Sequence, residues 1–245
     1  YPSRGLDFLV QTGWIVHFPE LDALRGVPQE PEWHPEGDAW EHTKHVCDAA
    51  ARIAIREGLK GEDRATLVFA ALCHDLGKAT TTEFLDGRWR AYGHPEAGVP
   101  LTQSFLERIG CFERIIAVVE PLVLCHMAHL FIPDRFTERG ARRLAVKLGQ
   151  ATIQQLAMVV ESDMNGRPPL PGGVPENVQA LVTLAEELRI IDEQPTPLIL
   201  GRHLIAQGME PGPHFSDLIQ QCFEAQLDGL FVDVEKGVLY LEGLI

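Results

Sequence analysis

Residues 66–78 read TLVFAALCHDLGK. The apolar run predicts a buried helix that ends on an adjacent imidazole and carboxylate, His74 and Asp75. Burying these polar groups is costly unless something compensates them, and a divalent cation would do so. Two further candidate ligands lie on apolar faces elsewhere, His42 earlier in the chain and Asp163 later. The order His, His-Asp, Asp therefore points to a metal site and to hydrolysis of phosphate esters.

Helical periodicity predicts that His42 and Asp163 both point toward the core. On a predicted helix over residues 39–58, His42 shares one face with Val46, Ala49, Ala50 and Ile53. On a predicted helix over residues 151–163, Asp163 shares its face with Leu156, Val159 and Val160. Taken singly, His42 reads as a satisfied core histidine, and Asp163 as a turn cap or a partner of Arg167. Their occurrence together with His74-Asp75 favours metal ligands.

Two more histidines extend this set. His94 follows Gly93 just before a predicted helix, and His126 continues the face of Ile115, Val119, Leu122 and Val123. With a shared Asp75 they would hold a second ion; otherwise His94 is an exposed loop residue and His126 packs beside Met127. Pro121 is expected to kink or split that helix. Imidazole and carboxylate ligands suit Ni, Mn, Co, Fe or Zn better than Mg or Ca, so we expect one or two transition-metal ions.

Basic side chains near these residues are candidates for binding phosphate. Lys78 follows His74 by about one helical turn, and Arg167 follows Asp163 in a loop rich in Gly and Pro; Arg suits bidentate phosphate contacts. The alternative is a solvated Lys and an Arg paired with a surface carboxylate.

We expect His34, Glu36 and Asp38 at the entrance to the site, with Asp38 as the N-cap of the helix starting near Ala39. The predicted catalytic residues are His74, Asp75 and Lys78, and the predicted substrate-binding residues are Lys78, Arg167, His34, His94 and His126.

Other hydrolytic machinery is missing from the sequence. There is no Ser-His-Asp arrangement, no G-x-S-x-G elbow and no Walker A loop. The expected nucleophile is therefore a metal-activated water, which needs no serine or cysteine.

The period of the apolar residues predicts an all-α protein, because strict period-2 alternation is nearly absent. Further helices are expected over residues 62–76, 96–109, 112–128, 138–149 and 174–191. Breaks rich in Pro occur at residues 165–175 and 194–197. We predict a helical-bundle domain over residues 1–192 and a small helical appendage over residues 193–245.

Composition excludes several classes of protein. The chain has 245 residues and a formal net charge of −14, which argues against tight non-specific binding of nucleic acid by this chain alone. We expect no membrane association, because the apolar runs are far shorter than a membrane span and no secretory signal opens the sequence. The five cysteines are an odd number without a C-x-x-C pair, so we expect reduced thiols and a cytoplasmic location.

The metal-ligand pattern resembles that of the HD superfamily of metal-dependent phosphohydrolases. The surrounding segments resemble the HD region of bacterial CCA-adding tRNA nucleotidyltransferases, and the tail looks like the C-terminal helical body of the same enzymes. The matching segments are residues 18–24, 33–38, 41–43, 72–78, 93–98 and 161–167, followed in the tail by residues 197–204 and 208–213.

This resemblance implies hydrolysis of 2′,3′-cyclic phosphates, 2′-nucleotides and other phosphomonoesters of nucleotides or RNA ends. The nucleotidyltransferase head, with its Gly-Ser pair and Asp-x-Asp, is not in this sequence. The chain is thus either a piece of a longer polymerase, with tRNA as a partner, or a stand-alone relative. The alternatives are a non-catalytic module that positions tRNA, and an HD hydrolase for another nucleotide such as a dNTP or guanosine tetraphosphate.

Overall fold

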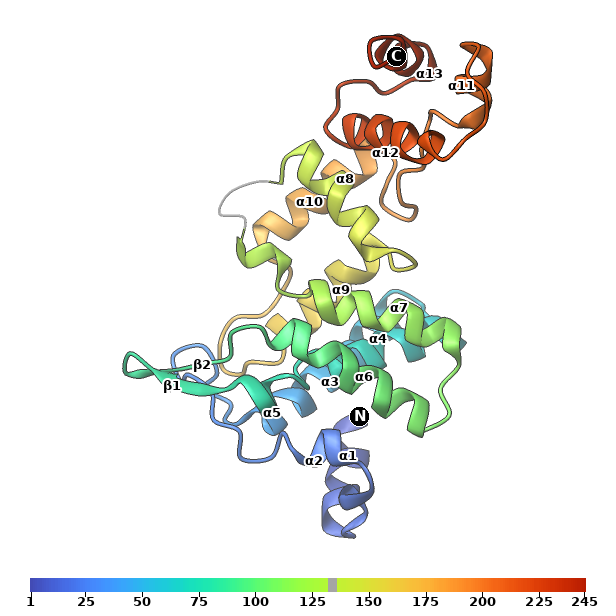
Figure 1. The fold of residues 1–245 in the computed structure, drawn as a ribbon. Coiled ribbons are helices and arrows are strands. Elements are labelled where there is room, and N and C mark those ends of the chain that lie inside the picture. Colours follow the sequence, from blue (N-terminus) through green and yellow to red (C-terminus); the bar gives the residue numbers. More distant parts are fainter. Residues whose placement is uncertain (132–135) are drawn as a thin grey trace.

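The computed structural model describes residues 1–131 and 136–245, and it confirms an all-α architecture (Figure 1). The only strands in this part of the chain form one short antiparallel hairpin. The N-terminus and the C-terminal helices lie at opposite ends of the molecule (Figure 1).

The α-helices are α1 (Pro2–Gln11), α2 (Pro19–Asp22), α3 (Ala39–Arg56), α4 (Gly61–Cys73), α5 (Lys78–Thr81), α6 (His94–Arg108), α7 (Glu113–Cys125), α8 (Glu138–Leu148), α9 (Ile153–Met164), α10 (Glu176–Glu187), α11 (Gly201–Ala206), α12 (His214–Leu227) and α13 (Val234–Glu242). Two 3₁₀ helices are η1 (Trp14–His17) and η2 (Ala128–Phe131).

Helix α4 occupies the middle of the main bundle, where α3, α7 and α9 pack against it. Its buried face carries the small residues Ala70 and Ala71, which let the neighbouring helices approach closely. The predicted inward faces of α3 and α9 are buried as well, except that Asp163 at the end of α9 is half-buried. The bundle therefore surrounds the segment that carries His74 and Asp75.

Two helices end earlier than their periodicity predicts. Helix α4 ends at Cys73 instead of residue 76, and α7 ends at Cys125 instead of residue 128. The C-cap residue is a histidine in both cases, and its Nδ1 donates to the carbonyl three residues earlier: 2.8 Å from His74 to Ala71 and 2.6 Å from His126 to Val123. These side chains satisfy carbonyls that a helix end leaves unpaired. Helix α7 continues through Pro121, so the expected split does not occur.

The hairpin pairs β1 (Glu83–Leu85) with β2 (Arg88–Arg90), and periodicity alone does not predict it. Asp86 and Gly87 form its turn with φ values of 51° and 77°. Asp-Gly is a strong signal for such a two-residue turn, because both central residues need positive φ. Strands of three residues are too short to show a period of two.

The C-terminal helices α11–α13 enclose a small hydrophobic cluster of their own, which includes Ile199, Leu204 and Leu241. Ion pairs connect this unit to α8: Arg143 lies 2.7 Å from Asp228, and Arg139 lies 2.9 Å from the same carboxylate. A domain boundary at residue 192 stays a prediction.

All five cysteines are unpaired; Cys111 is half-buried and the other four are buried. Within residues 1–131 and 136–245, no helix is both long enough and apolar enough to span a membrane.

Candidate metal centre

A close backbone approach joins the His74-Asp75 turn to the start of α6. A Cβ on Gly77 would lie 2.0 Å from the carbonyl oxygen of His94 and 2.7 Å from the amide nitrogen of Gly98. Only glycine leaves room for this contact. The glycine therefore brings Asp75 next to His94.

A second glycine places the end of α9 against α3. A Cβ on Gly166 would lie 2.3 Å from Cγ2 of Val46 and 3.1 Å from the amide nitrogen of the same residue. Because the backbones come this close, Asp163 faces His42, and its Oδ1 lies 3.2 Å from His42 Nε2. The two ligand candidates that are farthest apart in the sequence thus become neighbours.

The first group of candidate ligands is His42, His74, Asp75 and Asp163. Nε2 of His74 lies 3.3 Å from Nε2 of His42 and 3.2 Å from Oδ2 of Asp75, and the His42 nitrogen lies 3.6 Å from the same oxygen. Ligand atoms bound about 2.1 Å from one ion at tetrahedral or octahedral angles are roughly 3.0–3.4 Å apart. The spacing of the His42, His74 and Asp75 atoms therefore fits coordination of a single cation, and Asp163 joins this group through its contact with His42.

The second group is Asp75, His94 and His126. Oδ1 of Asp75 lies 3.3 Å from Nε2 of His94 and 3.9 Å from Nε2 of His126, and the two ring nitrogens are 3.2 Å apart. Asp75 directs one carboxylate oxygen to each group, so this carboxylate can bridge two ions.

The protonation of the rings leaves lone pairs facing one another. The Nδ1 atoms of three rings contact backbone carbonyls, which only accept hydrogen bonds, so Nδ1 carries the hydrogen and Nε2 of the neutral ring carries a lone pair. The Nε2 lone pairs of His94 and His126, 3.2 Å apart, cannot bond without a proton or a metal ion between them. This donor set fits a transition metal. The Nδ1 contacts are His74 to Ala71 at 2.8 Å, His94 to Ala91 at 2.7 Å and His126 to Val123 at 2.6 Å.

The electrostatics also favour a cation. Burial, with nearby His74 and His94, lowers the pKa of His126 to about 3, and burial lowers the pKa of His94 as well. Burial alone would raise the pKa of Asp75, but its interactions with His74 and Lys78 outweigh burial and hold this pKa well below its usual range. These histidines therefore present lone pairs, and the carboxylate presents a negative charge.

His42 differs from the other histidines. Burial opposes its charge, but hydrogen bonding to Asp163 and Glu36 outweighs burial and raises its pKa to about 9. The same contact with His42 lowers the pKa of Asp163, against the effect of burial. His42 and Asp163 thus form a buried pair that a metal ion would bind in place of a proton.

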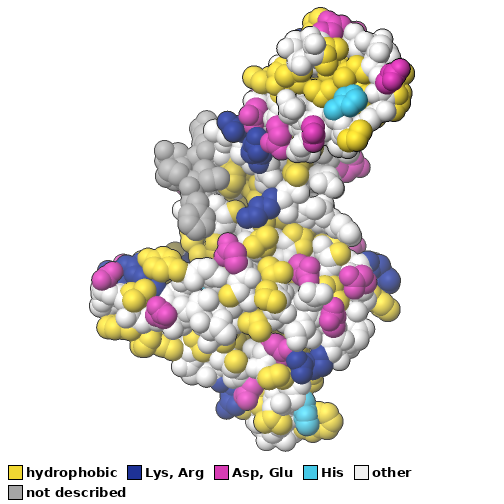
Figure 2. All heavy atoms as spheres, viewed as in Figure 1, with side chains coloured by type: hydrophobic (Ala, Val, Ile, Leu, Met, Phe, Trp, Pro, Cys, Tyr) yellow, Lys and Arg dark blue, Asp and Glu magenta, His cyan; other side chains and the backbone are white. Residues whose placement is uncertain are grey.

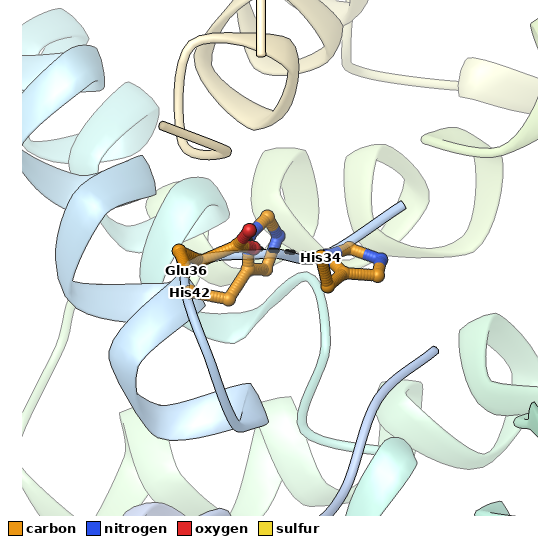
Figure 3. A group of neighbouring side chains, drawn as sticks. All are labelled: His34, Glu36 and His42. Carbon is orange, nitrogen blue, oxygen red and sulfur yellow. Dashed lines mark hydrogen bonds and ion pairs between the residues drawn. The ribbon is translucent and has the colours of Figure 1, made fainter. Parts of the chain in front are cut away.

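Glu36 lies behind His42 and not at the entrance, which corrects the position expected from the sequence. Its Oε1 is 2.7 Å from Nδ1 of His42 and 2.9 Å from Nδ1 of His34 (Figure 3). Burial would raise the pKa of Glu36, but these two contacts lower it to about 2. A carboxylate on the far nitrogen of a metal-ligating histidine orients the ring and increases its basicity.

The entrance is a cavity of about 460 Å³, and its lining includes Asp75, His94 and Asp163. His34 lines it too, with a side chain that is 17% exposed. Lys78 also lines it, with Nζ 2.7 Å from both Asp75 Oδ2 and Gln29 Oε1. Arg167 reaches the same cavity, and its Nε is buried without a hydrogen-bond partner.

The structure adds side chains that the sequence did not single out. Gln29 holds Lys78, and buried His129 lines the cavity with its Nδ1 3.1 Å from the carbonyl of His126. The i, i+3 spacing of His126 and His129 was an available signal for the latter. Asp38 is the N-cap of α3, as expected: its Oδ1 accepts from the Glu41 amide at 2.9 Å.

Comparison with known proteins gives a family match and several relatives. The family model described as "HD domain" matches residues 39–161. A multifunctional CCA protein of Cupriavidus metallidurans is 34% identical over 171 residues, which is 68% of this chain and 39% of that protein. Proteins of the same name from Xanthomonas axonopodis pv. citri and Pasteurella multocida are 39% and 36% identical, over 62% and 68% of this chain and 36% and 40% of their own length.

The chain spans about two fifths of the length of these curated relatives. No solved structure matches it. The family model covers the segment from the start of α3 into α9, which carries His42, the His74-Asp75 pair, His94 and His126, and it ends two residues before Asp163. The chain therefore belongs to the HD domain family, whose members form a superfamily of metal-dependent hydrolases.

Proposed function

We propose that this chain hydrolyses phosphate esters of nucleotides or RNA ends, of the 2′,3′-cyclic phosphodiesterase, 2′-nucleotidase or phosphatase type. The observation that carries the proposal is the convergence of four imidazole nitrogens and two carboxylates beside an open cavity. His42, His74, Asp75 and Asp163 would hold one divalent ion, and Asp75, His94 and His126 a second. Ni, Mn, Co, Fe and Zn fit these ligands better than Mg.

A bound ion would supply a water of lowered pKa and a Lewis acid for the phosphoryl oxygen. The chain's own residues do the rest. Lys78 and Arg167 bind and orient the phosphate from the cavity, and Asp75 holds Lys78 in place through its 2.7 Å contact. His34, held by Glu36, contributes a polar group to the substrate side of the cavity.

The deciding experiment removes and restores the metal. The purified chain is stripped with chelator and assayed on adenosine 2′,3′-cyclic phosphate and adenosine 2′-monophosphate, then reassayed with Mn, Co, Ni or Mg. We expect no hydrolysis without metal, recovery with the transition metals, and solvent ¹⁸O in the ring-opened monoester or the released phosphate. Full activity of the metal-free chain would contradict the proposal.

A second candidate follows from the relatives, which are named multifunctional CCA proteins. As part of a longer enzyme, the chain would help to position tRNA for a separate polymerase. The charge of −14 weighs against strong tRNA binding by this chain alone. A filter-binding assay with tRNA, run on the metal-free chain, distinguishes the two functions.

A further inference from the structure

Three aromatic side chains line the same cavity as Asp75, His94 and Asp163: Trp33, Trp89 and Tyr92. Trp33 directly precedes His34, and Tyr92 lies two residues before His94. Trp89 lies on β2, the strand that leads into this segment. Each of the three thus lies within five residues of His34 or His94.

Specific contacts hold the hairpin to the loop that carries Trp33. The amide of Trp89 donates to Glu30 at 3.2 Å, and Arg88 lies 2.9 Å from Glu32. The Arg88 guanidinium also lies over the ring of Trp33, 5.6 Å from its centroid. The loop and the hairpin therefore form one continuous wall of the cavity.

This wall exposes aromatic surface to solvent. Tyr92 is 69% exposed and Trp33 is 44% exposed, although aromatic rings gain much from burial. Figure 2 shows hydrophobic side chains together with Lys or Arg side chains on the projecting hairpin. Exposed aromatic groups beside a cavity with converging polar groups are typical of a ligand-binding site.

Arg90 also lines the cavity, and its Nε is buried without a hydrogen-bond partner. One of its terminal nitrogens donates to the Tyr92 hydroxyl at 2.9 Å, which orients the guanidinium. A buried donor without a partner is costly. Arg90 and Arg167 are therefore both placed to donate to acceptors on a ligand.

From these observations we infer that Trp33, Trp89 and Tyr92 form a stacking surface for the base of a nucleotide whose phosphate lies at the metal centre. The inference rests on the proposed function and names the base-binding residues. The cavity of about 460 Å³ is within the size range of small-ligand sites. Stacking accepts any base, so the surface selects nucleotides over base-free phosphate esters without strong base preference. The nucleotide is free or stands at the end of an RNA chain.

The test compares two probes on the full chain in chelator, so that binding is read without catalysis. One probe is adenosine 2′-monophosphate; the other is methyl riboside 2-phosphate, which keeps the sugar and phosphate and lacks the base. We expect the nucleotide to bind roughly 5- to 150-fold tighter by calorimetry. It should also quench tryptophan fluorescence, whereas the base-free probe should not.

Variants then locate the surface. Trp89→Leu and Tyr92→Leu should each reduce the preference for the nucleotide, and Tyr92→Phe should restore it because the ring remains. Trp14→Leu is the matched control, since Trp14 is 60% exposed and lies on η1, outside the cavity lining. Its preference should equal that of the wild type. Metal content after reloading verifies that each variant is folded.

Equal affinity of the wild type for both probes, or an unchanged preference in both leucine variants, would overturn the inference. Metal-dependent hydrolysis of the base-free probe would then still support the proposed function. Conversely, a clear nucleotide preference without any hydrolysis would reject the proposed function and keep the stacking surface. A short oligoribonucleotide ending in a 2′-phosphate distinguishes the two ligands, a free nucleotide and an RNA end. Tighter binding of the oligoribonucleotide than of the mononucleotide identifies an RNA end as the ligand. Equal or weaker binding identifies a free nucleotide.

Discussion

Asp163 is the most exposed of the candidate ligands, with 16% of its side chain accessible, against 0–2% for His42, His74 and Asp75. Replacing it by Ala removes a carboxylate from the group without opening the core. We predict that Asp163→Ala abolishes metal binding and hydrolysis while the helical content stays near that of the wild type. Elemental analysis and circular dichroism measure these quantities. Asp217→Ala, at an exposed position of α12, is the control, and unchanged metal content in Asp163→Ala would reject the ligand assignment.

Lys78 and Arg167 are predicted to act on the substrate and not on the metal. A hydrogen bond to a charged group contributes about 1.5–3 kcal/mol. Lys78→Met and Arg167→Met should therefore lower kcat/KM by roughly 10- to 100-fold with metal content unchanged. Steady-state kinetics with Lys236→Met, an exposed lysine on α13, as the control measures the effect. Full kcat/KM in both variants would show that neither binds phosphate.

Glu36 is predicted to hold the ring of His42 in its metal-binding orientation. Loss of such a supporting carboxylate weakens metal binding by roughly 10- to 100-fold. We expect this loss in Glu36→Ala and a smaller one in Glu36→Gln, whose amide oxygen still accepts from Nδ1. Competition with a chelating dye measures the affinity, and Glu32→Ala in the same loop is the control. A metal affinity equal to that of the wild type in Glu36→Ala would show that packing alone, and not Glu36, orients the ring of His42.

At the scale of the elements, helix ends build the site. His74 and His126 are C-cap residues of α4 and α7, and each satisfies a carbonyl of its own helix while directing Nε2 to the centre. The early helix ends and the candidate ligand orientations thus have one physical cause.

The start of α3 supports a prediction about stability. Asp38 accepts hydrogen bonds from the amides of Glu41 at 2.9 Å and Gly26 at 2.7 Å. Asp38→Ala should cost about 1 kcal/mol for the lost cap. In a chain of this size the melting temperature should fall by about 2–4 °C. Turnover at 25 °C should change by less than the metal-ligand variants change it.

Asp233→Ala is the matched control for this prediction, because Asp233 caps α13 through the Lys236 amide, far along the chain from the site. A large loss of turnover in Asp38→Ala with an unchanged melting temperature would instead place Asp38 in the catalytic machinery.

At the scale of the whole molecule, the two hydrophobic clusters share no residues. The described ion pairs between α8 and the C-terminal unit are largely exposed, and such pairs contribute about 0–1 kcal/mol each. We predict that residues 1–192 fold alone and keep metal binding and hydrolysis. Calorimetry and metal analysis of the truncated chain test this. Failure of residues 1–192 to unfold cooperatively would show that the C-terminal helices belong to one folding unit with the bundle.

Helical periodicity was sufficient to predict the all-α class and the inward faces of α3 and α9. Apolar residues repeat along each long helix, and burial of that stripe is a local property of the sequence. The pattern also named His42, His74, Asp75 and Asp163, because ionisable groups on apolar faces are conspicuous. It did not predict the hairpin, whose strands are too short to be periodic.

Tertiary structure decided the remaining features of the site. Asp75 faces two groups of ligands only because Gly77 lets the turn after α4 touch the start of α6. Glu36 reaches His42 because the loop before α3 folds back onto that helix. The aromatic wall forms because the hairpin contacts a loop far from it in the chain, with the Trp89 amide donating to Glu30. Helical faces follow from neighbours three and four residues apart, so the sequence determined them. The distances between ligands follow from how separate backbones pack, so only the folded chain determined those.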